Sequence, residues 1–267
     1  MASALAWQFC AIASVTIITT AAPFQPGQGD QGPGAPYNAA AKFYRVYSGA
    51  TEGKPDLRIS HVAIDRKHTT AADPASYFPL AALRQQAAAG RIGALAPRFH
   101  GVPTNRSQET TLTIDLPELV ARCRADAVDA AVLVPNCPVC HQSLSLAACA
   151  LEAAGIATVL MGCAKDIVEH VGVPRFVFSD FPLGNAAGRP HDPASQAFTL
   201  ELALRLLESA PAARCTVQSP LCWSTDPAWK LDYSNVDQLT AQDIVRLRAE
   251  FDAGKAQAAR QRAAAGR

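Results

Sequence analysis

The chain has 267 residues, of which 49% are hydrophobic and 18% charged, and its formal net charge is +1. This composition excludes an intrinsically disordered chain, which would carry fewer apolar and more charged residues, and it indicates a globular protein. The balanced charge, with no long basic run before the C-terminal tail, argues against nucleic acid as a partner.

The eight cysteines are too sparse and too irregularly spaced for a disulfide-built secreted scaffold. A cytoplasmic location, with one working pair and several buried thiols, is the simpler interpretation. Residues 11–22 are largely apolar, but no basic residue precedes them and three threonines interrupt the run. A buried strand at residues 15–20 is therefore favoured over an export signal. The apolar run is also too short to cross a bilayer, so we expect no association with membranes.

After this first strand, residues 23–57 form a long loop rich in Gly, Pro, Gln and Asp, with one short element near 42–47. Apolar runs and alternation predict further strands at 58–64, 92–96, 130–134, 157–162 and 175–179. Apolar spacing predicts helices at 79–89, 115–127 (with Asp115 as its cap), 138–154 and 163–171. Two more helices begin at Asp192, with Phe198, Leu202 and Leu206 buried, and at the capping sequence Thr240-Ala-Gln-Asp243. The chain between them, at 215–233, looks extended and irregular.

Strands that alternate with helices in this way predict an α/β fold, a mostly parallel sheet with helices on both faces (doubly wound, Rossmann-like or flavodoxin-like). We expect one such domain over residues 1–235, followed by a solvated helix and flexible tail over 236–267, where little is available to bury. In folds of this class the site lies beyond the carboxyl ends of the strands.

The segment from Val132 to Gln142 is the most informative part of the chain. A buried strand passes through Pro135 and Asn136 directly into Cys137-Pro-Val-Cys140 and an apolar-faced helix. Proline suits the first helical position, which places Cys137 at the N-cap, where its sulfur can accept hydrogen bonds from unpaired N–H groups. The helix dipole then lowers the pKa of Cys137, and Cys140, one turn inward, can form a disulfide with it.

Three interpretations of this Cys-x-x-Cys remain open. Redox or nucleophilic chemistry is favoured, and a purely structural role is the plainest alternative. The pair is also half of a zinc or iron–sulfur site, but no second pair follows, so Cys163 or His141 would have to complete the ligand set. His141 is alternatively a proton carrier or a solvent-facing side chain. Cys163 is either a second cap-position thiol or a buried one.

Other polar residues near predicted strand ends are candidates for binding a substrate. His61 lies in a predicted apolar strand and is either a hydrogen-bonded core residue or a catalytic one. Arg98 could grip a carboxylate or form a structural ion pair, and His100 follows it in a predicted loop. Asp65 and His68 could pair as base and orienter or belong to a solvated loop, and Asp180 opens a loop after a strand.

Six segments, in order over about residues 14 to 190, resemble the selenoprotein B family of glycine, betaine, sarcosine and D-proline reductases. They are Asp56-Leu-Arg-Ile-Ser-His-Val-Ala63, Ile92-Gly-Ala-Leu-Ala-Pro-Arg98, Val128-Asp-Ala-Ala-Val-Leu-Val-Pro135, Cys137-Pro-Val-Cys-His-Gln142, Leu151-Glu-Ala-Ala-Gly-Ile156 and Asp180-Phe-Pro-Leu-Gly184. The Cys-x-x-Cys alone is a weak signal, whereas the ordered set is fairly specific.

The resemblance implies reductive cleavage of a C–N or related bond in a small amine or carboxylate. Cys137 would be the nucleophile, at a position where the family often has selenocysteine, and Cys140 the resolving thiol. No cofactor is expected beyond this pair, and an external, thioredoxin-like thiol reductant would regenerate it. The family also uses a partner reductase subunit with a pyruvoyl carbonyl. This chain is shorter than the fermentative subunits and has sulfur in place of selenium, so a different substrate or a stand-alone relative stays open, as does a general disulfide reductase.

Overall fold

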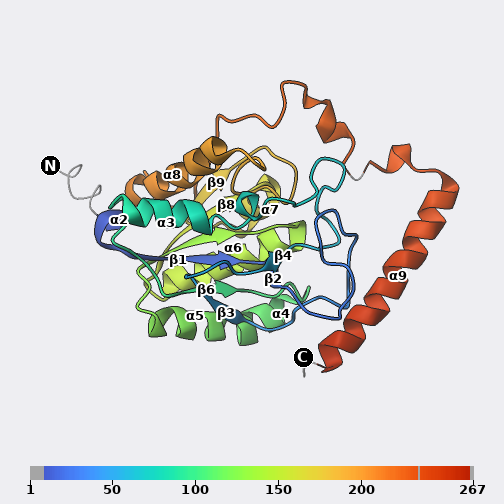
Figure 1. The fold of residues 1–267 in the computed structure, drawn as a ribbon, viewed down its shortest axis with the longest axis horizontal. Helices are drawn as coiled ribbons and strands as arrows, with labels where there is room; N and C mark the ends of the chain where they lie inside the picture. Colours follow the sequence, from blue (N-terminus) through green and yellow to red (C-terminus); the bar gives the residue numbers. More distant parts are fainter. Residues whose placement is uncertain (1–8, 234, 265–267) are drawn as a thin grey trace.

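The computed structural model describes residues 9–233 and 235–264, and its centre is a twisted sheet with the strand order β10-β9-β8-β7-β1-β6-β3 (Figure 1). All neighbouring strands are parallel except β3, which runs antiparallel to β6 at one edge. A short strand, β5, also pairs with the start of β1. The strands of this sheet are β1 (Ser14–Thr19), β3 (Tyr47–Ala50), β5 (Ala94–Leu95), β6 (Arg98–Gly101), β7 (Ala130–Val134), β8 (Ala157–Gly162), β9 (Arg175–Phe178) and β10 (Cys215–Gln218).

Helices cover both faces of the sheet, which confirms the predicted α/β class. One face packs against α3 (Leu80–Ala88) and α8 (Pro193–Ser209), and the other against α5 (Leu116–Ala125), α6 (Pro138–Ala153) and α7 (Lys165–Val171). The remaining helices are α2 (Phe9–Ile12), α4 (Gln108–Thr110) and α9 (Ala241–Ala264). Within the described ranges, no helix has both the length and the apolar composition needed to cross a membrane.

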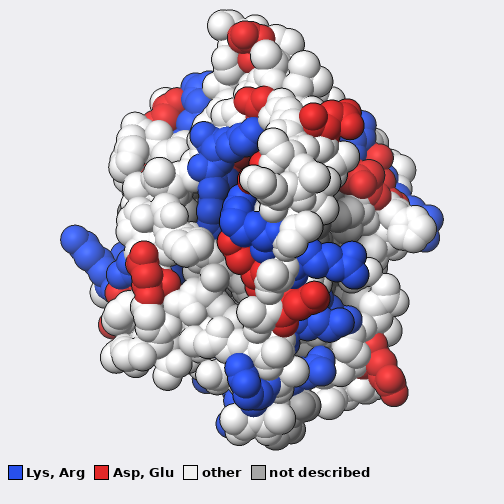
Figure 2. Space-filling model, turned by 90° about the vertical axis from the view of Figure 1, so that its right-hand side faces the viewer, with Lys and Arg blue, Asp and Glu red and all other residues white. Residues whose placement is uncertain are grey.

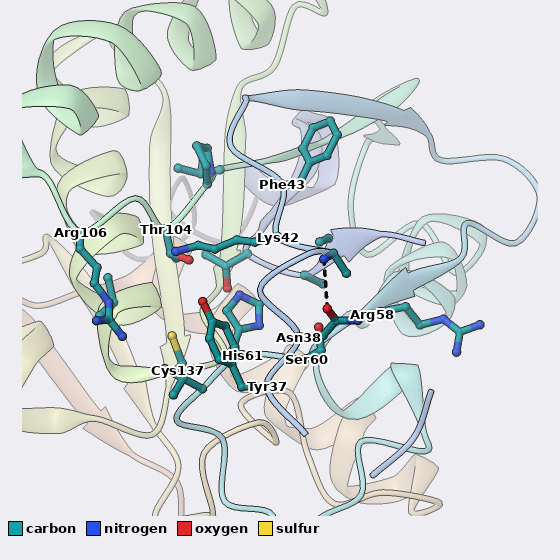
Figure 3. A pocket seen from close by; sticks show the side chains of 18 of the residues that line it. Tyr37, Asn38, Lys42, Phe43, Arg58, Ser60, His61, Thr104, Arg106 and Cys137 are labelled. Atoms are coloured by element: carbon teal, nitrogen blue, oxygen red, sulfur yellow. Dashed lines mark hydrogen bonds between the residues drawn. The ribbon is translucent and has the colours of Figure 1, made fainter. Parts of the chain in front are cut away.

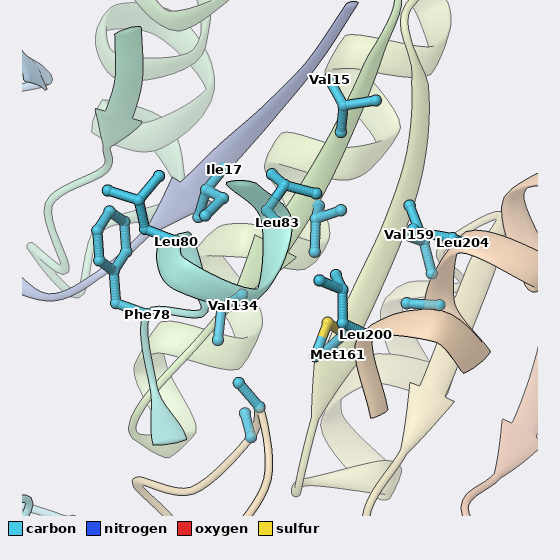
Figure 4. Packing of buried hydrophobic residues seen from close by; sticks show 14 of the residues in the cluster. Val15, Ile17, Phe78, Leu80, Leu83, Val134, Val159, Met161, Leu200 and Leu204 are labelled. Atoms are coloured by element: carbon cyan, nitrogen blue, oxygen red, sulfur yellow. The ribbon is translucent and has the colours of Figure 1, made fainter. Parts of the chain in front are cut away.

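The side chains of β7 show how the central strands divide the core in two. Ala130, Val132 and Val134 point into the cluster formed with α3 and α8, and Ala131 and Leu133 point into the cluster formed with α5 and α6. Figure 4 shows the first cluster, where Leu83 and Leu200 from the two helices meet strand residues. A strand buried on both faces has a continuous apolar sequence rather than an alternating one, which is why this run was recognisable.

The order of the strands creates a crevice beyond the end of β1. The chain leaves β1 in the middle of the sheet, and its neighbours β6 and β7 lie on opposite sides of it. At such a switch point the connections leave the sheet in opposite directions, and the space between them is where open α/β sheets bind ligands. Thr20, Val102 and Cys137 follow the carboxyl ends of β1, β6 and β7 within three residues.

The strand predicted at residues 58–64 is wrong. Only Leu57–Arg58 is extended, as β4, and it pairs antiparallel with β2 (Ala22–Pro23) outside the main sheet. Ile59 and Ile64 are buried, but Val62 is exposed, so burial does not follow the alternation, and the backbone between the two isoleucines is a loop that packs over the core. This change of element places His61 in a loop rather than in a strand.

Other differences concern element ends and faces. Asp115 is not a cap: the helical segment starts at Ser107, whose hydroxyl accepts from Thr110 N, and passes through a π-helical turn (Thr111–Asp115) into α5. Arg98 and His100 lie in strand β6 rather than in a loop. Phe198 is 42% exposed, because the helix turns Leu200 and Leu204 toward the sheet instead. The helix predicted from Cys163 begins at Lys165, with Ala164 as its N-cap.

The C-terminal segment follows the prediction more closely. Thr240 and Asp243 cap α9 reciprocally, because each side chain accepts a hydrogen bond from the other's backbone N–H, at 3.2 Å and 3.1 Å. No residue of α9 in the described range is buried. Residues 265–267 of the predicted flexible tail lie outside the described residues. The region predicted to be irregular also contains β10, which extends the sheet by one strand.

Candidate active site

The turn between β7 and α6 has the predicted cap geometry. Cys137 is the N-cap, with extended backbone (φ −123°, ψ 172°), and Pro138 begins the helix. The Cys137 sulfur accepts a hydrogen bond from Cys140 N at 3.3 Å, and the two sulfurs are 2.8 Å apart. Their side chains therefore already lie in the relative position that disulfide exchange requires, with both thiols free.

His141 holds this turn in place through both of its ring nitrogens. Its Nδ1 lies 2.8 Å from Cys137 O, and its Nε2 accepts a hydrogen bond from Cys163 N at 2.9 Å. Because a backbone N–H can only donate, Nε2 is unprotonated and Nδ1 carries the proton. Burial lowers the pKa of His141 and favours this neutral form. A Cβ on Gly162 would lie only 2.9 Å from the ring, so the close approach needs glycine there. The ring is fully buried, which contradicts the solvent-facing alternative.

Thr20 joins the turn to the end of β1. The backbone and side-chain N–H groups of Asn136 both donate to Thr20 Oγ1, at 3.2 Å and 3.1 Å. With its oxygen accepting twice, the hydroxyl proton of Thr20 is free to point elsewhere, and it donates to the Cys140 sulfur. The hydroxyl of Thr20, at the end of β1, thus links the turn after β7 to the inner cysteine, Cys140.

Of the two thiols, Cys140 is the more acidic. Burial opposes ionisation of Cys140, but hydrogen bonds from the Cys137 thiol, His61 and Thr20 hold its pKa well below the usual range. Burial raises the pKa of Cys137, and the charge on Cys140 raises it further. The prediction of a lowered pKa at Cys137 is therefore wrong, because the cap dipole is outweighed by desolvation.

Cys137 lies at the wall of a pocket whose empty space, with its open mouth included, is about 660 Å³. Figure 3 shows the side chains of Tyr37, Lys42, His61 and Arg106 gathered around its sulfur. Among the described residues that line the pocket there is no Asp or Glu, whereas Lys42, Arg45, Arg58 and Arg106 are basic. On the side of the molecule that carries the loops and α9, Lys and Arg form a band across the face, with acidic groups among and around them (Figure 2). The pocket is electrostatically suited to an anion.

Lys42 is the main site residue that sequence reasoning missed. Burial, then the nearby Arg106 charge, lowers the pKa of Lys42 to about 8, while the two cysteines raise it. Its ammonium also lies 5.0 Å from the centre of the Tyr44 ring. Lys42 belongs to the long Gly- and Pro-rich loop, which has no periodicity or motif, so no local signal could have identified it.

Of the predicted site residues, the fold brings His61 to the two cysteines. A ring nitrogen of His61 and the sulfurs of Cys137 and Cys140 all lie within 4.8 Å of one another. These three atoms are of the kinds that zinc prefers, and among the described residues no other group of three or more metal-ligating side chains is this close. His141 and Cys163, the ligands proposed from sequence, do not join them: the ring nitrogens of His141 face backbone groups of Cys137 and Cys163.

Arg98 and His100 lie elsewhere. Arg98 grips Asp126, with Nη2 2.7 Å and Nε 3.0 Å from its carboxylate, so the structural ion pair considered from sequence is present. His100 is fully buried, 2.8 Å from Ser48 Oγ and 3.3 Å from Asp126. Neither residue lines the pocket with Cys137.

Asp65, His68 and Asp180 also lie outside this pocket. Asp65 and His68 do pair, with Asp65 Oδ2 2.9 Å from His68 Nδ1, in a loop where Asp65 is buried and His68 half-buried. Asp180 forms an ion pair with Lys230. Cys163 is half-buried, and desolvation of its thiol raises its pKa to about 12, which favours the unreactive interpretation.

The fold and the site together define an α/β protein with a paired-thiol pocket at the switch point of its sheet. The sequence is 29% identical over 186 residues to the D-proline reductase subunit gamma of Acetoanaerobium sticklandii, which covers 69% of this chain and 76% of that protein. The aligned stretch is long enough to make this chain a distant relative of a reductase subunit. Because it is a larger share of that protein than of this chain, the reductase subunit is the shorter of the two, which contradicts the expectation that this chain would be shorter. No family model and no solved structure matches the chain.

Proposed function

We propose that the protein is a thiol-dependent oxidoreductase of the amino-acid reductase type, which cleaves a C–N or related bond in a small amine or carboxylate. The observation that carries this proposal is the 2.8 Å separation of two reduced sulfurs, one of which faces a pocket. The similarity to a protein named as a reductase subunit supports the same class of reaction.

The chemistry balances with the two thiols as the electron source. The Cys137 thiolate attacks the substrate carbon, so an S–C bond forms, the C–N bond breaks, and the amine leaves with a proton. The Cys140 thiolate then attacks the Cys137 sulfur, so an S–S bond forms, the S–C bond breaks, and the carbon takes up a proton. Two electrons pass from the dithiol to the substrate. Cys137 is the nucleophile because it faces the pocket, and Cys140 accepts its proton and later resolves the adduct.

The pocket supports a carboxylate-bearing substrate, because Lys42 and Arg106 lie beside the attacking sulfur with no acidic residue in the lining. His61 is placed to hold or transfer a proton near both thiols. The matched protein is named as one subunit of its enzyme, so a partner subunit belongs to the proposal, with D-proline as the first substrate to test. All eight cysteines are unpaired, which suits a reducing cytoplasm and an external thiol reductant of the thioredoxin type.

The test is a single-turnover reaction of the reduced full chain, under anaerobic conditions, with D-proline and a panel of other small amino acids. The wild type should convert the dithiol to a disulfide, measured by mass spectrometry, with formation of one ring-opened or deaminated product per chain. Cys137→Ser should abolish the reaction, while Cys163→Ser, a change to a thiol at the next strand end, should leave it unchanged. Disulfide formation that needs no substrate, or unchanged activity in Cys137→Ser, would refute the proposal.

A further inference from the structure

We infer that His61, Cys137 and Cys140 form a zinc site, in which Zn²⁺ and the disulfide are alternative states of the same two sulfurs. The first observation is the ligand set: two thiols and one imidazole nitrogen within 4.8 Å of one another. The set joins adjacent positions of one helical turn to a loop residue 76 positions earlier, so it exists only in the folded chain.

The second observation is an unused polar atom in the same place. Nδ1 of His61 is buried and has no hydrogen-bond partner, although His61 itself is only partly buried. Buried polar atoms are nearly always paired, and an exception calls for a function. Coordination through one ring nitrogen leaves the other as an N–H donor toward water or a ligand in the pocket, as is usual for metal-bound histidine.

The geometry needs only a small adjustment. Tetrahedral zinc with Zn–S bonds of about 2.3 Å separates two sulfurs by about 3.8 Å, so the present 2.8 Å must widen. Cys137 lines the pocket and has room to turn its sulfur outward, while Cys140 is enclosed. The protein supplies three ligands, and the fourth position faces the pocket, where water or a small ligand can enter.

The chemistry of the surroundings selects a soft cation. Hard cations such as Mg²⁺ and Ca²⁺ need several oxygen ligands, and no carboxylate lines this pocket among the described residues. Two thiolates and a neutral imidazole give zinc a complex with no net charge.

Zinc binding and disulfide formation exclude each other, because each uses both sulfurs. Under the proposed function, Zn²⁺ would therefore inhibit the reductase reversibly and protect the thiols from oxidation. The binding itself does not depend on that function, since it needs only reduced cysteines.

The experiment titrates the reduced, chelator-treated full chain with Zn²⁺ in competition with a chromophoric chelator, and with Co²⁺ as a spectroscopic probe. We expect one ion per chain, a thiolate-to-cobalt charge-transfer band with the intense visible bands of tetrahedral Co²⁺, and protection of Cys137 and Cys140 from alkylation. His61→Ala should weaken zinc binding by about tenfold or more. His68→Ala, which alters a histidine in the next loop, and Cys163→Ser should leave it unchanged.

The result that overturns the inference is equal affinity in wild type and His61→Ala, or zinc held elsewhere and retained by Cys137→Ser. Circular dichroism and a cooperative thermal unfolding transition verify that His61→Ala is folded, and His61→Gln provides a second variant of closer size. The two proposals can fail separately: a failed metal titration says nothing against substrate-driven disulfide formation, and the absence of that reaction says nothing against zinc binding.

Discussion

The protein has two polar clusters in which a histidine lies beside other titratable side chains, and they differ in whether they meet the pocket of Cys137. The first, around Cys137, Cys140 and His61, lies at the carboxyl ends of β1 and β7 and meets a pocket. The second, around His100 and Asp126, is built at β6, next to the edge strand β3, and does not line the pocket of Cys137.

In the second cluster the charged side chains are paired, although Nε2 of His100 makes no hydrogen bond and no pocket shared with Cys137 reaches it. Asp126 holds Arg98 and lies 3.3 Å from His100, while Ser48 Oγ accepts from Arg122 and lies 2.8 Å from His100 Nδ1. In the first cluster two sulfurs share a proton, and one His61 nitrogen has no partner. The difference teaches that the residue types do not mark the site. The site is marked instead by polar atoms that lack a hydrogen-bond partner and lie beside an accessible pocket.

The largest effect expected is on the chemistry of the first cluster. Cys140→Ser should lower multiple-turnover reduction by at least about a thousandfold, because no thiol remains to break the bond between Cys137 and the substrate carbon. A covalent adduct on Cys137 should accumulate and be visible by intact-mass spectrometry. Cys149→Ser, on the same helix, is the matched control. Continued turnover in Cys140→Ser would show that an outside thiol resolves the adduct.

The second cluster should instead determine how stability depends on pH. Burial, against the attraction of Asp126, lowers the pKa of His100 from 6.5 to about 4. Between these values the unfolded chain binds a proton at His100 and the folded chain does not. The free energy of unfolding should therefore fall by roughly 3 kcal/mol as the pH drops from about 6.5 to 4, from this group alone.

His100→Gln should remove much of this slope in urea denaturation experiments performed across that pH range. His68→Gln is the matched control, and neither substitution should change the alkylation rate of Cys137. A change in alkylation on substituting His100 would erase the functional distinction between the two clusters.

A smaller effect is expected from His61 on the reactivity of the thiol pair. The alkylation rate follows the thiolate, so it rises with pH and levels off above the pKa of the pair. Because His61 helps to lower the pKa of Cys140, His61→Ala should shift this plateau to higher pH and slow iodoacetamide alkylation near pH 7 by roughly tenfold. His68→Ala is the control and should have the wild-type pH profile. If His61→Ala has that profile too, His61 does not affect the pKa of Cys140.

The smallest effect is expected from Lys42. Its positive charge lowers the pKa of Cys137, and the pKa of Lys42 itself is about 8. Lys42→Met should slow alkylation by about threefold below pH 8, where the ammonium is charged, and the difference should vanish at higher pH. Lys165→Met, at an exposed lysine, should have no effect at either pH. A difference that grows with pH would contradict the assigned charge.

The sequence was sufficient for features that depend on near neighbours. The run Ala130–Val134, the proline at the first helical position and the sulfur at the N-cap all act within one strand and one helical turn, and each is found in the structure. The reciprocal cap of Thr240 and Asp243 is equally local. The alternation at 58–64 misled because two apolar residues of a loop, Ile59 and Ile64, are buried by contacts distant in sequence and not by a strand.

Composition and local pattern thus determined the α/β class, the parallel sheet and the position of the Cys-x-x-Cys at a strand-to-helix turn. Only the tertiary structure decided that His61, Lys42 and Thr20, from separate loops and strand ends, surround the two sulfurs, and that Arg98 and His100 do not. It also decided which sulfur carries the charge, because desolvation and hydrogen bonds from distant residues outweigh the helix dipole that the local sequence supplies.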